Sequence, residues 1–418
     1  MQYILSIGMN DYRNRAGGTN KVILAHQELF RKHGYGYIYI CPVKEKKYKF
    51  WEVIINNHFC CVRSTEQLIL FLYHLQVKNN YISEVHIHHL LSVSLDTIDS
   101  LLSYIEGNIK YYIHDYYSIC PSIKLMKNDL KYCGSEMMSK KKCGDCKYYQ
   151  SGKENNAKLE KKIMKYENSI TLVAPSDVAK NIWLNAYDQY QDKVMVIYHQ
   201  KLQGNYTGNK ELVKDEIKIG YLGEASYPKG WAVWNMIVEM MSEKRYRFFY
   251  FGKDKLKMKK VSDIHVDFRK NLDAMVHALR KNPMDCVLLW SILEETYSYT
   301  YYESLAANTF VITNEQSGNI ARQVKVRKNG IVLHSEKELI ELMQNFDLLK
   351  RYINEFKQSH LTGPDKLVEN PELLEHINTD TNKNVSKIKE SAPTLEERIF
   401  SLYYKCLQGI YCMKRIWV

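Results

Sequence analysis

Short apolar segments alternate with segments of helical periodicity along most of the chain. In the first 200 residues, runs of β-branched and aromatic residues predict strands, and apolar residues spaced three and four apart predict helices between them. The predicted strands are 3–7, 37–40, 51–55, 84–88, 110–114, 171–174 and 194–198. The predicted helices are 18–33, 65–77, 95–105, 154–167 and 177–187. Strands separated by helices of this length are typical of parallel βαβ units.

The same alternation starts again after a polar stretch, 200–215, which predicts a linker. The second set of predicted strands is 217–222, 248–251, 287–290, 310–313 and 330–333, with helices at 230–242, 271–280 and 301–308. A further helix begins at a capping box formed by Ser335 and Glu338. Two successive α/β units predict two doubly wound parallel sheets that face one another across an interdomain cleft at the carboxyl ends of their strands.

The end of the chain departs from this alternation. The segment 376–393 is polar and predicts a loop, and Thr394 and Glu397 then form a second capping box. The helix that follows, 394–418, has one apolar face, formed by Ile399, Leu402, Tyr403, Cys406, Leu407, Ile410 and Met413. Two interpretations stay open: the helix packs back on the N-terminal domain, or it lies at a membrane surface with its Lys, Arg and Trp side chains at the headgroups.

Composition and charge limit the classes of protein and partner. The chain has 418 residues, 45% hydrophobic and 25% charged, and only 19 Gly and 8 Pro, which excludes collagen-like and long disordered chains. Fifty-nine Lys and Arg against 47 Asp and Glu give a net charge of +12, which favours anionic partners such as nucleotides, phosphate-bearing lipids, acidic membranes or nucleic acid. The apolar runs are too short to span a bilayer and the N-terminus has no basic leader, so we expect a cytoplasmic protein, with peripheral contact at the inner face of the membrane as an option.

Two glutamates give the strongest chemical signal. Glu295 and Glu303 are separated by seven residues, within a strand–loop–helix–strand segment. Glu295 follows a buried strand, where its carboxylate can accept hydrogen bonds from sugar hydroxyls. Backbone N–H groups of residues 296–298 begin the next helix and offer a site for a diphosphate. Glu303 lies two turns further along, where it can hold a ribose diol. The alternative is a pair of acids on a solvated helix face.

This arrangement resembles the retaining GT-B glycosyltransferases of the family 4 type, which include glycogen-synthase-like and polysaccharide-building enzymes. That family carries a Glu-x7-Glu motif in which Phe and Gly follow the first glutamate; Tyr297 and Ser298 stand at these positions here, and Glu303-Ser-Leu-Ala-Ala matches the motif's end. A serine fits at position 298 if its φ angle stays negative. The resemblance implies a GT-B fold with an N-terminal acceptor domain, 1–205, and a C-terminal donor domain, 206–385.

The resemblance also implies roles for residues at other strand ends. Gly17 and Gly18, between the first strand and helix, would let phosphate or acceptor approach closely; the alternative is a simple tight turn. Gly223 begins a loop that ends in Lys229 and Gly230, where Lys229 would neutralise the departing diphosphate. The family's arginine in this loop is replaced by Glu224, and Lys253 or Arg322 could supply the missing charge.

A histidine-rich segment provides the last implied site residues. His114 would contact the donor sugar, and Asp115 could fix its tautomer. His88 and Asp115 are the predicted acceptor-binding residues, and a satisfied structural histidine is the alternative for His114. A zinc site of His86, His88 and His114 is disfavoured by their spacing along the strands.

Four cysteines predict a separate metal site. Cys120, Cys133, Cys143 and Cys146 lie in a Cys-rich insert, 118–152, and four thiolates could close a tetrahedral structural zinc site. A redox pair and free thiols are the alternatives.

Taken together, these residues favour a retaining glycosyltransferase that moves a sugar from a UDP- or GDP-sugar donor to a glycan or lipid-linked glycan acceptor in the synthesis of capsule, O-antigen or exopolysaccharide. No catalytic metal is implied, because Lys229 and helix N–H groups supply the positive charge. The alternatives are a basic zinc-containing nucleic-acid-binding protein, and a non-catalytic or epimerase-type GT-B protein that binds sugar nucleotides. Nucleic acid is not expected as a partner, since the basic residues are dispersed along the chain.

Overall fold

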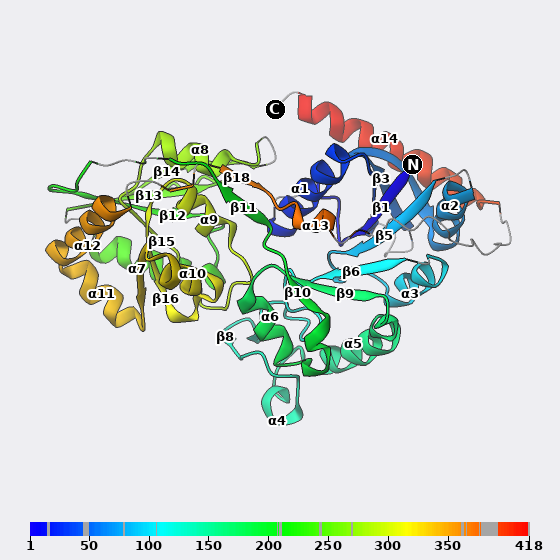
Figure 1. The fold of residues 1–418 in the computed structure, drawn as a ribbon, viewed down its shortest axis with the longest axis horizontal. Helices are drawn as coiled ribbons and strands as arrows, with labels where there is room; N and C mark the ends of the chain where they lie inside the picture. Colours follow the sequence, from blue (N-terminus) through cyan, green and yellow to red (C-terminus); the bar gives the residue numbers. More distant parts are fainter. Residues whose placement is uncertain are drawn as a thin grey trace.

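Two open sheets, each covered by helices on both faces, organise the chain into two lobes (Figure 1). The computed structural model describes residues 1–14, 17–44, 50–77, 80–105, 107–206, 208, 211–241, 245–268, 271–360, 363–364, 366–375, 377 and 392–416. The first lobe contains an eight-stranded sheet and the second a six-stranded sheet, so the predicted pair of Rossmann-like sheets is present.

The first sheet has the strand order β10-β9-β6-β5-β1-β2-β3-β4. The strands are β1 (Gln2–Ile7), β2 (Gly36–Pro42), β3 (Phe50–Ile55), β4 (His58–Ser64), β5 (Tyr81–Ile87), β6 (Asn108–Tyr112), β9 (Ile170–Ala174) and β10 (Val194–Val196). Its helices are α1 (Gly18–Lys32), α2 (Thr65–Val77), α3 (Leu95–Tyr104), α5 (Tyr149–Lys162) and α6 (Asp177–Leu184). The strands from β10 to β2 are parallel to their neighbours, as βαβ connections require.

Strands β3 and β4 form an antiparallel hairpin at one edge of this sheet. The predicted strand 51–55 is present as β3, but it pairs antiparallel with β2 and not in a parallel βαβ unit. Strand β4 was not predicted. It follows a two-residue turn in which Asn56 and Asn57 have φ angles of 50° and 71°. Asparagine tolerates this left-handed conformation, which matches the twist of a hairpin.

The core of this sheet explains why its strands are continuously apolar. Successive residues of a strand point to opposite faces, and here both faces are buried. Leu5 and Ile7 pack with α2, α3, α5 and α6, whereas Ile4 packs on the other face with Ile23 and Phe30 of α1.

The second sheet is parallel throughout, in the order β14-β13-β12-β15-β16-β17. The strands are β12 (Ile217–Leu222), β13 (Tyr246–Gly252), β14 (Val261–His265), β15 (Cys286–Leu288), β16 (Phe310–Asn314) and β17 (Gly330–Leu333). Helices α7 (Trp231–Met241), α11 (Glu336–Gln344) and α12 (Phe346–Ser359) cover one face, and α8 (Ala274–Lys281), α9 (Tyr299–Ala306) and α10 (Asn319–Arg327) cover the other. Ser335 is confirmed as the N-cap, since its Oγ accepts the N–H of Glu338 at the start of α11; the Glu338 carboxylate accepts the N–H of His334 and not that of Ser335.

The chain crosses between the lobes twice, and the two crossings pair with each other. The predicted linker 200–215 is wrong at its start, because β11 (Gln200–Gln203) pairs antiparallel with β18 (Lys366–Glu369). After β18, the short helix α13 (Glu372–Glu375) returns to the first lobe, where Leu373 packs with Ile4 and Phe30. The predicted loop 376–393 lies outside the described residues apart from 377, 392 and 393.

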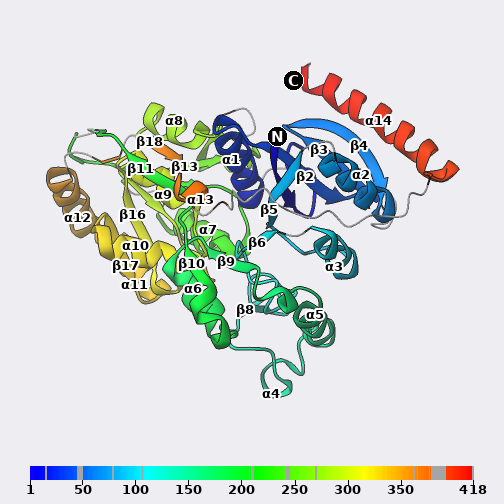
Figure 2. The ribbon, with the colours of Figure 1, turned by 45° about the vertical axis from the view of Figure 1, so that its right-hand side comes forward.

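Helix α14 (Leu395–Ile416) packs against β4, at the edge of the first sheet (Figure 2). Its capping box is confirmed by the contact of Thr394 Oγ1 with the N–H of Glu397. The packing face differs from the one expected if the apolar residues packed inward; Leu407 is partly buried, and the side chains of Ile410 and Met413 lie outside the described residues. Phe400 is buried against Phe50, whereas Ile399, Leu402, Tyr403 and Cys406 of the predicted face are exposed. Along the described part of the chain, no helix combines the length and the apolar composition needed to cross a membrane.

Candidate active site

A cavity of about 610 Å³ lies between the two lobes, at the carboxyl ends of strands from both sheets. Most of the residues predicted for the site line it, from elements that are far apart in the sequence. These residues are Gly17, Gly18, His114, Asp115, Gly223, Lys229, Glu295, Tyr297, Ser298 and Glu303. The cavity is therefore the meeting point of the segments that the sequence marked separately.

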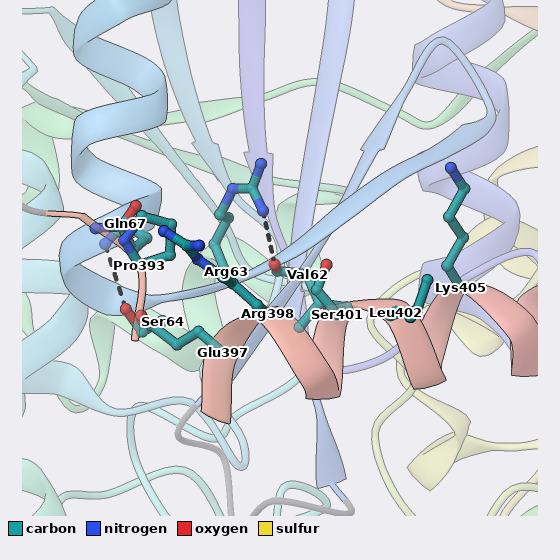
Figure 3. Close-up of a pocket in the computed structure, with 10 residues that line it drawn as sticks. All are labelled: Val62, Arg63, Ser64, Gln67, Pro393, Glu397, Arg398, Ser401, Leu402 and Lys405. Atoms are coloured by element: carbon teal, nitrogen blue, oxygen red, sulfur yellow. Dashed lines mark hydrogen bonds between the residues drawn. The ribbon is translucent and has the colours of Figure 1, made fainter. Parts of the chain in front are cut away.

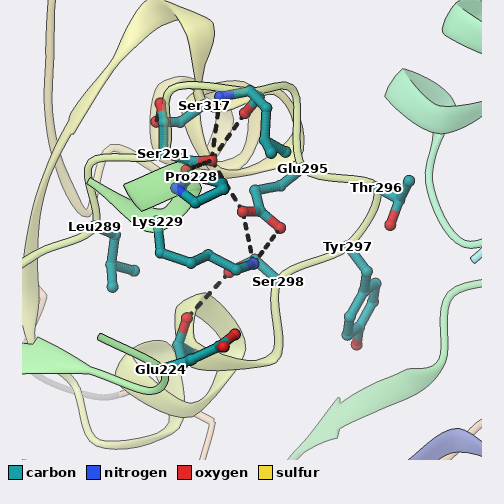
Figure 4. Close-up of polar contacts among 12 residues, drawn as sticks. Glu224, Pro228, Lys229, Leu289, Ser291, Glu295, Thr296, Tyr297, Ser298 and Ser317 are labelled. Atoms are coloured by element: carbon teal, nitrogen blue, oxygen red, sulfur yellow. Dashed lines mark hydrogen bonds and ion pairs between the residues drawn. The ribbon is translucent and has the colours of Figure 1, made fainter. Parts of the chain in front are cut away.

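Lys229 and Glu295 form the central contact of the cavity (Figure 4). The Lys229 Nζ atom lies 2.7 Å from both Glu295 carboxylate oxygens, and Ser291 Oγ donates a further hydrogen bond to Oε1 at 2.9 Å. The carboxylate is almost fully buried, with 9% of its side chain exposed, whereas 42% of the Lys229 side chain is exposed. Lys229 is thus the member of the pair whose side chain is accessible to a ligand in the cavity.

Two loops hold this pair, and each depends on a glycine. Gly230 has φ +78°, and a Cβ atom there would lie 1.9 Å from the carbonyl oxygen of Trp290. Gly318 has φ +59°, and a Cβ atom there would lie 2.5 Å from the backbone nitrogen of Glu295. Only glycine combines this conformation with such a close approach. The two glycines therefore fix the backbone on both sides of the ion pair.

The loop after β12 is closed by a tyrosine. The Tyr221 hydroxyl lies 2.9 Å from the carbonyl oxygen of Glu224 and 3.2 Å from that of Lys229. These contacts clamp the two ends of the 224–229 segment, including the short 3₁₀ helix Tyr227–Lys229. Lys229 is thereby presented toward Glu295 from a constrained backbone.

Ser298 precedes α9 in a left-handed conformation, with φ +69°. The condition stated for a serine at this position, a negative φ angle, is therefore not met. A non-glycine residue in this region is strained by roughly 1–2 kcal/mol, and the strain is kept because the neighbouring residues are fixed on both sides. Ser298 makes no side-chain cap for α9, and Ser298, Tyr299 and Thr300 all line the cavity. The start of α9 consequently faces the cavity, with the positive end of its dipole toward any ligand there.

Glu303 is held by a cation from the other lobe. Its Oε1 atom lies 2.6 Å from Lys21 Nζ of α1, and both side chains are nearly buried. The same ammonium group lies 4.7 Å from the centre of the Tyr299 ring. This interlobe ion pair, together with the hydrogen bond from Thr296 Oγ1 to the carbonyl oxygen of His114, fastens α9 and the Glu295 loop to the first lobe.

His114 lies at the cavity, and its ring is held by His88. The distance between His114 Nε2 and His88 Nδ1 is 2.9 Å, and His88 itself is buried and does not line the cavity. The acceptor-binding interpretation of His88 is thus replaced by one in which it supports His114 from behind. Burial lowers the pKa of both histidines well below the usual value, so both rings are neutral.

Asp115 contacts a different histidine from the one predicted. Its carboxylate pairs with His89 Nε2 at 2.5 Å and accepts the N–H of Tyr117, so it does not fix the tautomer of His114. Burial alone would lower the pKa of His89, but the charge and hydrogen bond of Asp115 raise it overall. Burial by itself would raise the pKa of Asp115, and the charge of His89 lowers it overall.

Several lining residues were not predicted. Lys21 is the fourth residue of α1, and His199 follows β10; burial lowers the pKa of His199 to about 3. Tyr250 and Phe268 provide aromatic walls in the second lobe. A lysine one turn into the first helix and a histidine after the last strand of the first sheet are the sequence signals that could have identified the first two.

The two residues proposed to replace the missing arginine have different positions. Lys253 lines the cavity. Arg322 instead pairs with Asp177 of α6, with an NH2–Oδ2 distance of 3.1 Å, and does not line the cavity.

The four cysteines lie away from the cavity, in the segment that contains β7 (Met126–Lys127), β8 (Lys131–Tyr132) and α4 (Lys140–Cys143). Cys120 and Cys143 are buried, and Cys133 Sγ donates to the carbonyl oxygen of Leu125 at 2.9 Å. Among the described residues, three potential metal ligands within 4.8 Å of one another occur at His26, His86 and His88, and not among these four thiols. The zinc site stays a prediction.

Solved structures of other proteins share the fold of this chain. No protein-family model matches the sequence, and no curated protein matches it significantly. Solved structures do match. Sucrose-phosphate synthase from Thermosynechococcus elongatus has 13% sequence identity and a TM-score of 0.53, and the match covers 90% of this chain and 96% of that one. A glycosyltransferase from Rickettsia africae has 15% identity and a TM-score of 0.51, and the match covers 85% of this chain and 92% of that one. Anabaena HepE in complex with UDP-glucose is also similar, with 10% identity and a TM-score of 0.50 over 86% of this chain and 94% of that one. The chain has the two-domain, Rossmann-like GT-B fold of these glycosyltransferases.

The strain at Ser298 can be tested by stability. We expect Ser298→Gly to raise the free energy of unfolding by up to about 1 kcal/mol, because glycine adopts φ +69° without a clash. Ser298→Thr should lower it by about 1 kcal/mol, since a β-branched residue is less tolerant of this conformation. Urea unfolding checks both. Ser298→Ala is the control that removes the contact with Thr300 and keeps the strain, and a Gly variant no more stable than this control would contradict the prediction.

The Asp115–His89 pair predicts a pH dependence of stability. Because folding raises the pKa of His89 above its ordinary value of 6.5, the stabilisation by the pair is full below that pH and declines as the pH rises through the folded-state pKa. We expect His89→Gln to lower the free energy of unfolding by about 1.5 kcal/mol near pH 6, and by less above about pH 8. Urea unfolding at several pH values measures this difference. The exposed His58→Gln is the control, and a difference that grows toward alkaline pH would rule the prediction out.

Proposed function

We propose that this protein is a retaining GT-B glycosyltransferase of the family 4 type, which transfers a sugar from a UDP- or GDP-sugar to a glycan or lipid-linked glycan acceptor during surface polysaccharide synthesis. The observation that carries the proposal is the Lys229–Glu295 contact at the interlobe cavity, with the start of α9 and His114 beside it. These groups offer positive charge, a carboxylate and a neutral imidazole within one cavity, which are the groups that a nucleotide sugar needs.

In this proposal the second lobe binds the donor. Lys229 Nζ and the first N–H groups of α9 neutralise the diphosphate, where charge develops as the sugar departs. Glu295 keeps its hydrogen bond from Ser291 and turns its other oxygen to the hydroxyls of the sugar. Glu303 accepts hydrogen bonds from the ribose hydroxyls, in place of its present contact with Lys21.

The first lobe, residues 1–205, supplies the remaining groups. His114 reaches the cavity as a neutral ring, so it can exchange hydrogen bonds with sugar hydroxyls, and His88 holds its orientation. Gly17 and Gly18 leave room at the entrance on the side of α1, where the acceptor approaches. The acceptor oxygen then bonds to the anomeric carbon on the face that the diphosphate leaves. The electron pair of the broken bond stays on the diphosphate, which takes the proton of the acceptor hydroxyl.

The similar solved structures support a nucleotide-sugar donor. HepE has been solved with UDP-glucose and with UDP and glucose, and both of those structures share the fold of this chain at a TM-score of 0.50. Sucrose-phosphate synthase shares the fold at 0.53. UDP is therefore the first nucleotide to test, with GDP and CMP beside it.

Donor binding should be visible as thermal stabilisation. We expect one of UDP, GDP and CMP to raise the melting temperature selectively, because a ligand at 100 times its dissociation constant stabilises the folded state by about 2.7 kcal/mol. Lys229→Ala should remove most of the shift, since it deletes the cation that meets the diphosphate. The control is Lys337→Ala, an exposed lysine of α11. A shift that is the same in Lys229→Ala and wild type would contradict the site, and no shift with any nucleotide would contradict the proposed activity.

Substitution of Glu295 should separate binding from turnover. In wild type the carboxylate competes with the diphosphate for Lys229. We therefore expect Glu295→Gln to bind the free nucleoside diphosphate at least as tightly as wild type, while sugar transfer falls by about 100-fold because the sugar loses its charged partner. Calorimetry and release of the nucleoside diphosphate measure the two effects. Weaker nucleotide binding with unchanged transfer would overturn the role given to Glu295.

A further inference from the structure

The exposed face of α14 is apolar. The residues Leu395, Ile399, Leu402 and Tyr403 have 74%, 61%, 66% and 56% of their surface exposed. Their spacing of three to four residues places them on one side of the helix. We call these four residues the apolar stripe. A row of large apolar side chains facing water is unusual on a protein surface and indicates a site of interaction.

The structure prevents the apolar stripe from turning inward. The opposite side of α14 is bound to the first sheet, where the Phe400 ring packs 4.9 Å from that of Phe50. The Tyr404 hydroxyl and the Gln408 amide each donate to the Glu52 carboxylate at 3.1 Å. Glu52 is buried and also pairs with Arg13 at 2.9 Å. Rotation of the helix would leave this carboxylate with fewer donors in a buried environment, which is strongly unfavourable.

A cationic groove, drawn in Figure 3, meets the apolar stripe at Leu402. This groove, about 300 Å³ in volume, lies between β4 and α14 and is lined by Arg63, Arg398 and Lys405. Hydroxyl and amide groups of Ser64, Ser401 and Gln67 line it as well, with Glu397 as the acidic member. Leu402 belongs both to the groove and to the apolar stripe. Cations and apolar side chains are thus arranged as adjacent bands on one surface.

We propose that this surface docks on an anionic lipid bilayer. The apolar stripe enters the boundary between headgroups and acyl chains, and Arg63, Arg398 and Lys405 bind the phosphates of the headgroups. An apolar helix face with a cationic flank is the arrangement by which helices lie in a membrane interface, and anionic lipids attract the flank. The net charge of +12 acts in the same direction. The proposal rests on α14 and β4 alone and does not depend on the proposed transferase activity.

Sedimentation with vesicles tests the docking directly. We expect the full chain to sediment with phosphatidylglycerol–phosphatidylcholine vesicles and to stay in solution with pure phosphatidylcholine vesicles. Added salt should weaken the binding, because it screens the attraction between the cations and the lipid surface. Soluble glycerophosphate at the same phosphate concentration should not displace the protein, because it lacks the acyl region that holds the apolar stripe.

Two variants separate the apolar and cationic contributions. Ile399→Ser with Leu402→Ser should reduce the partition coefficient by at least tenfold; its control is Met240→Ser with Val326→Ser, two exposed apolar residues on α7 and α10. Replacement of Arg63, Arg398 and Lys405 by Gln should reduce it on the order of 100-fold, from about fivefold per cation. Its control replaces Arg247, Lys337 and Arg351 by Gln, which removes three positive charges from the second lobe instead. Thermal unfolding verifies that each variant is folded.

Three outcomes would overturn the proposal. Wild-type protein that ignores anionic vesicles would do so, and so would equal binding by the variants and their controls. The third is a dimer, seen by analytical ultracentrifugation, that Ile399→Ser with Leu402→Ser converts to a monomer without any change in vesicle binding. The apolar stripe would then bind a second copy of this chain and not a membrane.

Discussion

The candidate site depends on the adjacency of β12 and β15 in a parallel sheet. Because the two strands are hydrogen-bonded neighbours that run in the same direction, the loops that follow them emerge at the same edge, and Lys229 meets Glu295 although 66 positions separate them in the chain. The close approaches at Gly230 and Gly318 leave these loops little freedom. A short ion pair results, in which Glu295 is nearly buried and Lys229 is partly exposed, and a competing anion is the ligand best suited to open it.

The segment from Glu295 to Glu303 also joins the two lobes. Thr296 donates to the carbonyl oxygen of His114 and its own carbonyl oxygen accepts from Ser176, while Glu303 pairs with Lys21. All three partners belong to the first lobe. The residues assigned to ligand binding are thus the residues that set the position of one lobe on the other. In the proposed function, a ligand that engages Glu303 would replace its interlobe contact with Lys21.

The GT-B fold persists here with 10–15% identity to the similar solved structures, and two positions differ from the motif that the sequence resembles. Ser298 takes the left-handed conformation that glycine would adopt freely, because the loop before α9 is fixed on both sides. Glu224 replaces the expected arginine, and among the described residues the cations that line the cavity are Lys21, Lys229 and Lys253. Two of these three come from the predicted donor lobe. Six carboxylates line the same cavity, so these lysines are local cations within a lining that is acidic overall: Asp115, Glu224, Asp254, Asp267, Glu295 and Glu303.

The sequence by itself determined the two α/β units, the order of most strands along the chain and a core set of the residues that line the cavity, because a strand buried on both faces and the glycines and polar residues at its end leave a local pattern. It did not reveal Lys21, His199, the pairing of Asp115 with His89, or the position of His88 behind His114. Those depend on which side chains meet across lobes and strands, and no local periodicity records such contacts. The orientation of α14 is the clearest case. The sequence shows that Ile399 and Leu402 share an apolar face but leaves open whether that face packs on the protein; the buried Glu52 carboxylate binds Tyr404 and Gln408, and Ile399 and Leu402 are exposed.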